Sequence, residues 1–342
     1  MSDINIRKTG CAGRVTLSRP KALNSLTYGM AMAIDAALID WAADDDIRVV
    51  VIDAEGPKAF CAGGDIQQLY ETGIKGDYAF GQKFWRDEYR LNARIAEYPK
   101  PIISFMQGFV MGGGVGIGCH AALRVIDNST QIAMPECGIG LVPDVGGSLL
   151  LARAPGRLGA YLGLTAARMG PGDAIYAGFA DRHIPQDQWP ALIRSLEIDG
   201  DVSALPASSE GLETPLAKVQ SELDTAFVGP VQQIIAHLDN LEGEIASSAR
   251  KSLDRNSPLS MAVTLEILNQ LQKTSDIRNA LTLEYRFTAR AMEHGDLLEG
   301  IRAQIIDRDR NPQWKHKVVT EKEVAKMLAP LPQDLTFEED AQ

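Results

Sequence analysis

The chain has 342 residues, enough to bury a large core, and its 45% hydrophobic and 23% charged residues are typical of a folded protein. With 45 acidic and 34 basic side chains the formal net charge is −11. This balance disfavours a broad nucleic-acid-binding surface, because such a surface needs clustered Lys and Arg. The four cysteines form no Cys-x-x-Cys pair and lack histidines at zinc-finger spacing, so we expect reduced, buried thiols and no metal site.

The first residues of the chain show no targeting pattern. They lack the apolar segment of a secretory signal, and they are not the Arg-rich, acid-poor sequence of a transit peptide. We therefore expect an intracellular, cytoplasmic protein.

The first 55 residues alternate between strand and helix patterns. Residues 15–17 are short and β-prone, and Pro20 ends this strand because proline donates no ladder hydrogen bond. Thr27 is a suitable N-cap for a helix that continues to about Ala43. The β-branched run at 48–52 (RVVVI) is typical of a strand buried on both faces. Strand, helix and buried strand predict an α/β fold.

Residues 101–123 carry no formal charge if His120 is neutral, and they are numerous enough to span a bilayer. Six glycines within this stretch would make a poor helix in any solvent. We predict a buried strand at 102–106, a glycine turn at 112–114 and a helix at 115–122. A strand, a glycine-rich turn and a helix then occur twice, at 49–72 and 102–122, which suggests a repeated β-β-α unit.

The rest of the chain reads as mainly helical after two more strands. Prolines 99 and 101 close a long helix at 78–98. We expect strands at 124–126 and 131–133 and helices at 147–153, 157–164, 171–177, 230–253, 258–271 and 275–293. Residues 199–215 have the composition of a linker. We therefore divide the chain into a core, 1–200, and a mainly helical C-terminal region, 201–342.

Two glycine-rich turns, at Gly63-Gly64 and at 112–114, follow buried strands and open helices. Amide groups at a helix N-terminus lack intrahelical partners and favour negative charge. One donor from each turn would form an oxyanion hole, although ordinary turns explain most such patterns. A dinucleotide site is disfavoured, since Ile117 breaks the Gly-x-Gly-x-x-Gly order and no Walker lysine follows.

Two carboxylates, Glu136 and Asp144, stand in an apolar, glycine-rich segment, AMPECGIGLVPDVGG. A buried carboxylate is costly unless it is paired or protonated. One alternative is structural, with Asp144 capping the next helix. The other is general acid–base chemistry by a group with a raised pKa. Glu88, among charged neighbours, is most simply solvated or ion-paired, and no Gly-x-Ser-x-Gly elbow supports a serine hydrolase.

Four ordered segments resemble the crotonase, or enoyl-CoA hydratase/isomerase, superfamily: RPKALNSL (19–26), FCAGGD (60–65), GFVMGGGVGIG (108–118) and AMPECGIGLVPDVGG (133–147). The resemblance implies a crotonase (ClpP-like) spiral of β-β-α units with a CoA thioester site in the core. It also implies an oligomer, often a trimer or hexamer. The superfamily's two oxyanion amides map onto Gly64 and Gly113.

One departure from the superfamily bears on the reaction. Hydratases of this superfamily place two glutamates across the substrate double bond. The second maps onto Glu136, whereas the first maps onto Gly116, so simple hydration is disfavoured.

Further segments resemble a branch that hydrolyses 3-hydroxyisobutyryl-CoA, a thioester of valine breakdown. They are RDEY (86–89), PDVGG (143–147), LEYR (283–286) and EGIRAQIIDRDRNPQW (299–314). In that branch the substrate-contacting residues map onto Glu88, Gly113, Glu136 and Asp144, which makes Glu88 a candidate site residue.

We therefore expect thioester hydrolysis, with coenzyme A as part of the substrate and no separate cofactor. Gly64 and Gly113 would hold the oxyanion, while Glu136 would deprotonate water or attack the carbonyl itself. Asp144 would bind the 3-hydroxyl or protonate the thiolate, and Glu88 would steer water or pair with the hydroxyl. Lys21 is a candidate for the CoA phosphates. The alternatives are an enoyl-CoA hydratase or isomerase, and a non-catalytic acyl-CoA-binding protein.

Overall fold

The computed structural model describes residues 3–272 and 276–337. Its contacts divide the chain into two compact units, each built from three stretches of sequence. Unit 1 comprises Met1–Asp65, Leu91–Ile132 and Arg168–Pro215, and unit 2 comprises Ile66–Arg90, Ala133–Ala167 and Leu216–Gln342.

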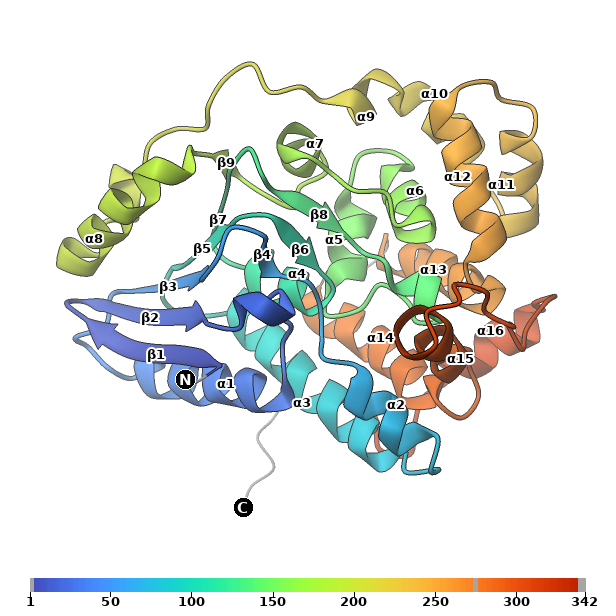
Figure 1. Ribbon diagram of the computed structural model, residues 1–342, viewed down its shortest axis with the longest axis horizontal. Coiled ribbons are helices and arrows are strands. Elements are labelled where there is room, and N and C mark those ends of the chain that lie inside the picture. Colours follow the sequence, from blue (N-terminus) through green and yellow to red (C-terminus); the bar gives the residue numbers. More distant parts are fainter. Residues whose placement is uncertain (1–2, 273–275, 338–342) are drawn as a thin grey trace. The chain divides into compact units, whose positions relative to one another are not determined.

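Unit 1 is built on a six-stranded sheet of order β1-β2-β3-β5-β7-β9 (Figure 1). Its strands are β1 Ile4–Thr9, β2 Ala12–Leu17, β3 Val49–Ala54, β5 Ile102–Met106, β7 Leu123–Ile126 and β9 Arg182–His183. The β1–β2 pair is antiparallel, and the pairs from β2 onward are parallel. The predicted β-branched strand is thus central, with Val50 beside Ile102 of β5.

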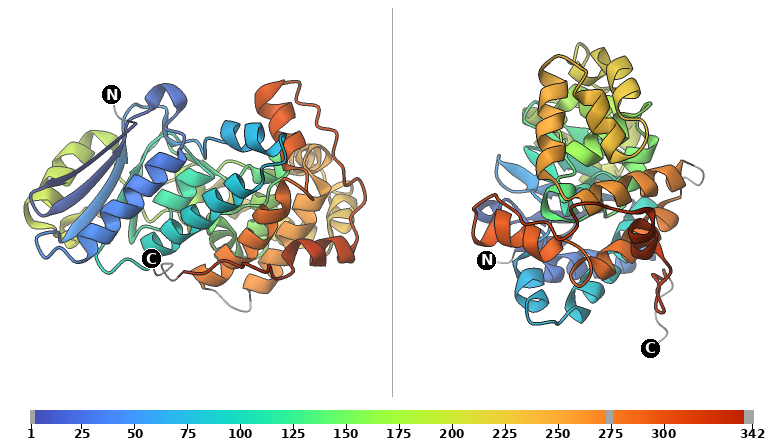
Figure 2. Two further views of the ribbon diagram at one scale, coloured as in Figure 1. Left: turned by 90° about the horizontal axis from the view of Figure 1, so that it is seen from below. Right: turned by 90° about the vertical axis from the view of Figure 1, so that its right-hand side faces the viewer.

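Helices cover both faces of this sheet, which is why its central strands are apolar on both sides (Figure 2). Helix α8, Trp189–Asp199, packs with alternate strand residues such as Val49 and Val51 in one core cluster. Helix α1, Tyr28–Ala42, covers the other face, where its Trp41 ring lies so close to Gly13 that a Cβ there would clash. Thr27 caps α1 as predicted, because its hydroxyl accepts from the Met30 amide at 3.2 Å.

The predicted β-β-α repeat is confirmed. The second strand of each repeat joins a separate three-stranded sheet of order β4-β6-β8. The repeats are β3, β4 (Ala59–Cys61) and α2 (Gln67–Gly73), followed by β5, β6 (Phe109–Met111) and α4 (Gly113–Gly118), and then β7, β8 (Gln131–Ala133) and the 3-10 turn η2 (Glu136–Ile139). A third repeat therefore follows the two that the sequence suggested.

The uncharged stretch at 101–123 folds as predicted into strand, glycine turn and short helix. Helix α4 begins two residues earlier than expected and ends at Gly118, not at residue 122. Its glycines are tolerated because the helix lies against β4, where a Cβ on Gly114 would approach the Cys61 carbonyl oxygen to 2.2 Å. Among the described helices, none combines the length and the apolarity needed to cross a bilayer.

The remaining helices of unit 1 are short. They are η1 Pro20–Ala22, α7 Pro171–Tyr176, η3 Gln186–Gln188 and η4 Val202–Ala204. Helix α3, Ala79–Ala96, runs from unit 2 into unit 1, and α9, Pro215–Lys218, begins at the last boundary between the units.

Unit 2 is mainly helical. Besides α2 it contains α5 Gly147–Arg153, α6 Leu158–Thr165, α10 Gln220–Ala226, α11 Val231–Leu238, α12 Glu244–Arg255, α13 Pro258–Leu271, α14 Ile277–Ala291, α15 Leu297–Ile301, the π-helix η5 Arg302–Ile306 and α16 Glu321–Leu328. Helix α13 contacts α5, α6, α11, α14 and α16, and it has buried residues from Leu259 to Leu271, although Asn269 is exposed.

One helix prediction in unit 2 is wrong. The stretch at 230–253 is two helices, α11 and α12, because the chain turns between them and Gly243 adopts φ +117° before α12 begins. A backbone angle in that range ends regular helix and favours glycine. The periodic apolar pattern continues across the break since both helices bury one face.

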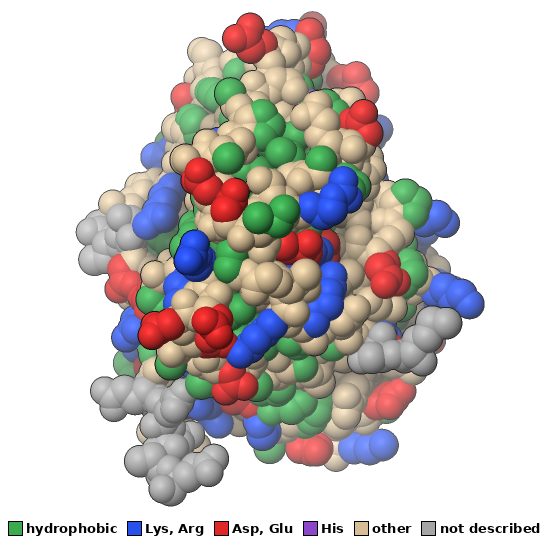
Figure 3. Space-filling model, turned by 90° about the vertical axis from the view of Figure 1, so that its left-hand side faces the viewer, with side chains coloured by type: hydrophobic (Ala, Val, Ile, Leu, Met, Phe, Trp, Pro, Cys, Tyr) green, Lys and Arg blue, Asp and Glu red, His purple; other side chains and the backbone are tan. Residues whose placement is uncertain are grey.

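The compact units follow a different division from the predicted one at residue 200. The chain also passes from one unit to the other near residues 65, 90, 132 and 167. Only the passage at Pro215 falls within the predicted linker. The division into domains 1–200 and 201–342 stays a prediction. Three of the four cysteines are buried as predicted, whereas Cys11 is only half-buried. On the face drawn in Figure 3, Lys and Arg side chains are interspersed with Asp and Glu.

Candidate active site

The predicted site residues fall into two groups, one in each unit. Gly64, Gly113 and Lys21 belong to unit 1, whereas Glu88, Glu136 and Asp144 belong to unit 2. Each group is described within its own unit below.

The two glycine turns of unit 1 lie side by side at the same edge of the small sheet. Strands β4 and β6 are parallel, and Cys61 of β4 is the register partner of Val110 of β6. Gly64 follows Cys61 by three residues, and Gly113 follows Val110 by three residues. The turns are therefore equivalent continuations of paired strands, which is the juxtaposition that an oxyanion hole needs.

The two candidate amides are alike in that each is an unused hydrogen-bond donor among the described residues. Within the described part of the chain, neither the Gly64 nor the Gly113 amide donates a hydrogen bond. Each follows a glycine in the left-handed region, Gly63 at φ +115° and Gly112 at φ +47°. Side-chain-bearing residues rarely adopt these angles, so each turn depends on the glycine that precedes the candidate amide.

A neighbouring loop holds the Gly64 turn in place. Leu26 pairs with Gly64 in a parallel bridge, where the Leu26 amide donates to Gly63 and its carbonyl accepts from Asp65. The fully buried Asn24 anchors that loop, since its side-chain amide donates to the Glu55 and Ala59 carbonyl oxygens at 2.9 Å. The RPKALNSL motif thus supports the turn, a role that its residue types alone did not indicate.

Lys21 lies in η1, at a hollow of about 300 Å³. The residues that line this hollow are Pro20, Lys21, Leu23, Glu55, Gly56, Pro57, Lys58 and Ala59. Lys58 contributes a second exposed cation, which the sequence analysis did not single out. Two lysines at one hollow can hold a phosphate as point charges, so the predicted role of Lys21 stays a prediction with a plausible partner.

Four buried carboxyl groups of unit 2 interact electrostatically with one another. Glu88 on α3, Glu136 at the start of η2, Asp144 before α5 and Glu284 on α14 are each 5% exposed or less. The simplest sequence interpretation of Glu88, a solvated side chain, is wrong because α3 turns this residue into the helical core. Like charges buried together disfavour ionisation, so the cluster holds protons that exposed carboxyls would lose.

Asp144 is the member that shares an electrostatic interaction with each of the others. The Tyr89 hydroxyl donates to its Oδ2 at 2.7 Å, and the Tyr89 ring packs edge-on against Tyr285. Burial raises the pKa of Asp144 to about 6, while the Tyr89 hydrogen bond acts in the opposite direction. Asp144 is therefore the carboxyl most ready to ionise near neutral pH.

Glu88 and Glu136 each have one carboxyl oxygen without a hydrogen-bond partner among the described residues. Among the described residues, nothing bonds to Glu88 Oε1 or Glu136 Oε2, although both atoms are buried. Burial and the nearby Asp144 raise the pKa of Glu88 to about 8, and the same causes raise the pKa of Glu136 well above its usual range. Unpartnered buried carboxyl oxygens are expensive in a merely structural pair, whereas they are useful where a substrate supplies the missing bond.

Glu284 is a member of the cluster that we did not predict. Its Oε2 accepts from the Gly146 amide at 2.8 Å, and its Oε1 accepts from the Ser148 amide at 3.2 Å and from the Ser148 hydroxyl. Glu284 thus satisfies the N-terminal amides of α5, so the alternative in which Asp144 caps that helix is wrong. Its only sequence signal was the LEYR segment, which carried no role.

The turn between Asp144 and α5 is strained. Val145 has φ +52° and is buried, and Gly146 follows at φ +78°. A β-branched residue in the left-handed region costs roughly 1–3 kcal/mol and persists only where the surroundings impose it. The Glu284 bonds on one side and the Tyr89 bond on the other impose this turn, and together they fix where the Asp144 carboxylate points.

The two groups offer complementary chemistry. Backbone amides without partners can stabilise a developing oxyanion, and carboxyls with raised pKa values can give or take protons near neutral pH. Gly116, where hydratases of the superfamily carry their first glutamate, lies buried within α4 and offers no carboxylate.

Comparisons with known proteins identify the family of this chain. A family model described as enoyl-CoA hydratase/isomerase matches residues 12–329. The mitochondrial 3-hydroxyisobutyryl-CoA hydrolase of Xenopus tropicalis is 38% identical over 329 residues, which cover 92% of this chain and 85% of the relative. The human protein of the same name is 34% identical over 345 residues and covers 94% and 87%.

Two solved structures are similar over nearly their full lengths. An enoyl-CoA hydratase from Rhodobacter sphaeroides is 59% identical with a TM-score of 0.96, covering 98% of this chain and 100% of that one. A carnitinyl-CoA dehydratase from Mycobacterium thermoresistibile is 42% identical with a TM-score of 0.94 and covers 99% of each chain. The β-β-α repeats, the paired glycine turns and these matches agree, and the chain belongs to the crotonase, or enoyl-CoA hydratase/isomerase, family.

Proposed function

We propose that this protein hydrolyses the thioester of a short 3-hydroxyacyl-CoA, with 3-hydroxyisobutyryl-CoA of valine breakdown as the first candidate substrate. Water and the thioester would give 3-hydroxyisobutyrate and coenzyme A. The observation that carries the proposal is the buried cluster of Glu88, Glu136 and Asp144 in a chain that has glycine at position 116. The names of the curated relatives support it over most of the chain.

The first step is polarisation of the thioester carbonyl. The free amides of Gly64 and Gly113 would donate to its oxygen and hold the negative charge that forms in the tetrahedral intermediate. A pair of backbone donors needs no reorganisation during the reaction, because the turns already present them. The proposal requires that these amides and Glu136 act on the same carbonyl group.

Glu136 would supply the attack on that carbonyl. In one route its carboxylate removes a proton from water, the water oxygen bonds to the carbonyl carbon, and the tetrahedral intermediate then collapses with cleavage of the C–S bond to release the thiolate. In the other, the carboxylate bonds to the carbon, the C–S bond breaks to give a mixed anhydride, and water then hydrolyses the anhydride. Burial raises the pKa of Glu136 well above its usual range, so Glu136 must first give up a proton in either route; the carboxylate that results is a stronger base than an exposed glutamate.

The other two carboxyls would handle the substrate hydroxyl and the departing thiolate. Asp144, held by Tyr89, would accept a hydrogen bond from the 3-hydroxyl or pass a proton to the thiolate. Glu88, with a pKa of about 8, carries a proton at neutral pH and would donate to the hydroxyl or steer the water. The leaving sulfur takes one proton, so free thiol is the product to measure.

A second candidate function is hydration of an enoyl-CoA. The similar structures named as a hydratase and a dehydratase favour it. Hydration needs an acid to replace the glutamate that Gly116 lacks, and Glu88 is the protonated carboxyl that could do so. A non-catalytic acyl-CoA-binding role would leave the cost of burying these carboxyls unexplained.

A thiol-release assay separates these functions. The protein is incubated with 3-hydroxyisobutyryl-CoA and a thiol-reactive dye, and in parallel with crotonyl-CoA while the loss of the conjugated double bond is followed. We expect thiol release and no hydration. Hydration of crotonyl-CoA without thiol release would replace the hydrolase proposal, and binding without either reaction would point to the non-catalytic role.

The two routes of hydrolysis differ in where the water oxygen goes. In a single turnover in ¹⁸O-water, only the anhydride route can label the carboxylate of Glu136, and mass spectrometry of the peptide that contains it detects the label. A labelled peptide establishes the anhydride route, whereas an unlabelled peptide is expected both from the general-base route and from attack of water on the substrate acyl carbon of the anhydride. Phosphate binding by Lys21, a cytoplasmic location and a trimeric or hexameric assembly stay predictions from the sequence.

A further inference from the structure

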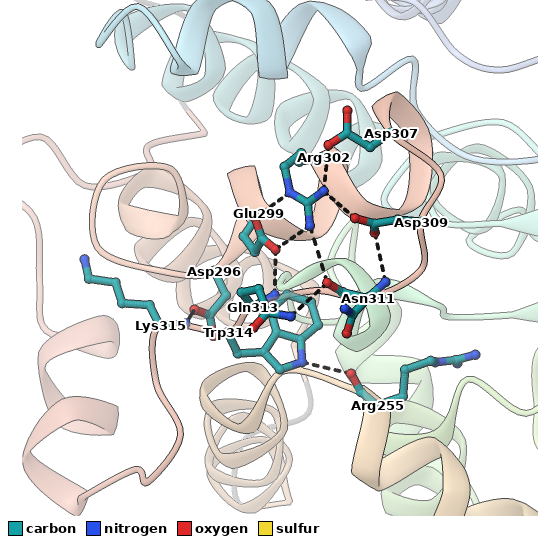
Figure 4. Close-up of polar contacts among 10 residues, drawn as sticks. All are labelled: Arg255, Asp296, Glu299, Arg302, Asp307, Asp309, Asn311, Gln313, Trp314 and Lys315. Carbon is teal, nitrogen blue, oxygen red and sulfur yellow. Dashed lines mark hydrogen bonds and ion pairs between the residues drawn. The ribbon is translucent and has the colours of Figure 1, made fainter.

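The segment 299–314, which the sequence resemblance singled out, takes no part in the chemistry proposed above. Figure 4 shows that it forms a polar network around Arg302 of η5. The Arg302 guanidinium pairs with Glu299 at 2.8 Å, Asp307 at 2.6 Å and Asp309 at 2.7 Å. Because Glu299 lies on α15 and the two aspartates follow η5, these bonds hold the loop after η5 close to α15.

The loop then crosses the junction between α12 and α13. The Trp314 indole donates to the Arg255 carbonyl oxygen at 2.8 Å. The Asp296 carboxylate, whose side chain is fully buried, accepts from the Lys315 amide at 2.9 Å and from the Ser257 hydroxyl at 2.7 Å. Asp296 thereby joins this loop to the residue that caps α13.

Both Ser257 and Asp296 also contact the turn that carries Glu136. The Ser257 amide donates to the Cys137 carbonyl oxygen at 3.0 Å. On the other side, a Cβ on Gly140 would lie 2.5 Å from the Asp296 carbonyl carbon. A Cβ on Gly300 would lie 2.1 Å from the Ile139 carbonyl oxygen, so the segment from Asp296 to Gly300 is packed backbone against backbone on this turn.

These contacts have a consequence for Glu136 itself. Its carboxylate has no hydrogen bond from the side chain of another described residue, and its Oε2 has no partner at all among them. The carboxylate does accept a hydrogen bond from its own backbone amide, so its direction follows from the backbone of η2. A small movement of a reacting group is enough to slow a reaction severely.

We propose that Asp296 is a positioning residue for Glu136, acting through the Ser257–Asp296 bond, which we call the Asp296 clamp. The clamp holds η2 between the α13 N-terminus and α15. This inference rests on the proposed function, since it concerns how the proposed catalytic carboxylate is aimed. It also gives the 299–314 segment a role, which is to keep the Asp296 side of the clamp closed.

The test uses the full-length chain with three variants. Ser257→Ala removes only the hydroxyl, Asp296→Ala removes the carboxylate, and the double variant removes both. Thr320→Ala is the matched control, because Thr320 is the N-cap of α16 in the same unit and its loss mimics the loss of a helix cap. The measurements are kcat and KM for thiol release, and the rate at which Cys137 is alkylated, located by peptide mass spectrometry.

Cys137 reports on the turn independently of activity. It is adjacent to Glu136, it is buried, and its thiol contacts the Thr264 hydroxyl at 3.5 Å. We expect each clamp variant to lower kcat by roughly 10- to 100-fold with KM little changed, and to speed Cys137 alkylation at least tenfold. The double variant should lower kcat by less than the product of the two single effects, because the Ser257–Asp296 bond is lost in both single variants. Thr320→Ala should change neither measurement.

Several results would overturn the inference. It fails if kcat is kept while Cys137 becomes reactive, or if kcat falls while Cys137 stays protected. It also fails if the two single variants multiply in the double variant. Absence of thiol release by the unmodified protein would sink the proposed function alone. The clamp would then be judged by alkylation: faster reaction in both variants but not in Thr320→Ala supports it, and equal rates overturn it. Should Asp296→Ala not fold, Ser257→Ala alone decides by the same measurements.

Discussion

The two groups of site residues differ in kind: the group in unit 1 consists of main-chain amides, and the group in unit 2 consists of side-chain carboxyls. In unit 1 the candidate groups are main-chain amides at Gly64 and Gly113, which carry no titratable proton and depend only on backbone conformation. In unit 2 they are carboxyls whose burial shifts their pKa values, and each depends on its side-chain neighbours. The first group should therefore be insensitive to pH and intolerant of backbone change, and the second should be the reverse.

This contrast also explains how each group is supported. The glycine turns need a sheet edge and the Asn24 anchor, both of which are local to unit 1. The carboxyls need Tyr89, Glu284 and the Asp296 clamp, which come from helices far apart in the sequence. A site built from side chains thus depends on more of the chain than a site built from the backbone.

The largest effect is expected from the carboxyl group of Glu136. Glu136→Gln keeps the size of the side chain and removes its ability to take a proton or to attack. Loss of an acid–base group of this kind costs up to about 10⁴-fold in kcat. Thiol release is the measurement, with the exposed Glu222→Gln as control; full turnover in Glu136→Gln would remove this residue from the mechanism.

A backbone change in unit 1 should come next. Gly113→Pro deletes the amide hydrogen at the first position of α4, where proline fits a helix. The expected loss is roughly 100- to 1000-fold in kcat, the usual effect of removing one oxyanion donor. Glu321→Pro deletes the equivalent amide of α16 and should leave kcat unchanged. If the pH profile of Gly113→Pro also moved, the proposed separation between the two groups would be wrong.

Stability should depend on pH through unit 2. The pKa of Glu88 rises from 4.5 to about 8 in the folded chain, so folding keeps a proton that the unfolded chain loses. The free energy of stabilisation that Glu88 contributes to the folded state is fully present below pH 4.5 and is lost as the pH rises to about 8. Glu88→Gln should therefore raise Tm at pH 8.5 by at least about 2 °C and change it little at pH 4, as calorimetry can measure. An equal shift from the exposed Glu71→Gln would show that burial is not the cause.

The smallest effect is expected at the hollow beside η1. Lys21→Ala removes an exposed cation, and exposed ion pairs contribute up to about 1 kcal/mol, or about fivefold in KM. The effect should fade as salt is raised, since screening weakens exposed pairs. The matching pantetheine thioester, which lacks the nucleotide phosphates, is the control substrate. An increased KM for that substrate too would exclude a role in phosphate binding.

Much of unit 1 was readable along the chain. The strand at 48–52, the Thr27 cap, the break at Pro20 and the repeated β-β-α pattern all depend on neighbouring residues, and the structure confirms each of them. The helix at 230–253 failed because its apolar period continues through the turn before Gly243. Periodicity reports which residues face the core, and it does not report where the chain bends.

The composition and the order of residues were enough to predict an α/β chain, two glycine turns able to present amides, and a pair of acids in an apolar segment. These features are local, because turn geometry and strand burial depend on a few adjacent residues. Folding in three dimensions was needed to bury Glu88, to bring Glu284 to α5 in place of Asp144 as its cap, and to close Asp296 on the turn of Glu136. Those contacts join residues separated by 39 to 138 positions, and a pKa or a direction that depends on such neighbours has no signature within any short stretch of the chain.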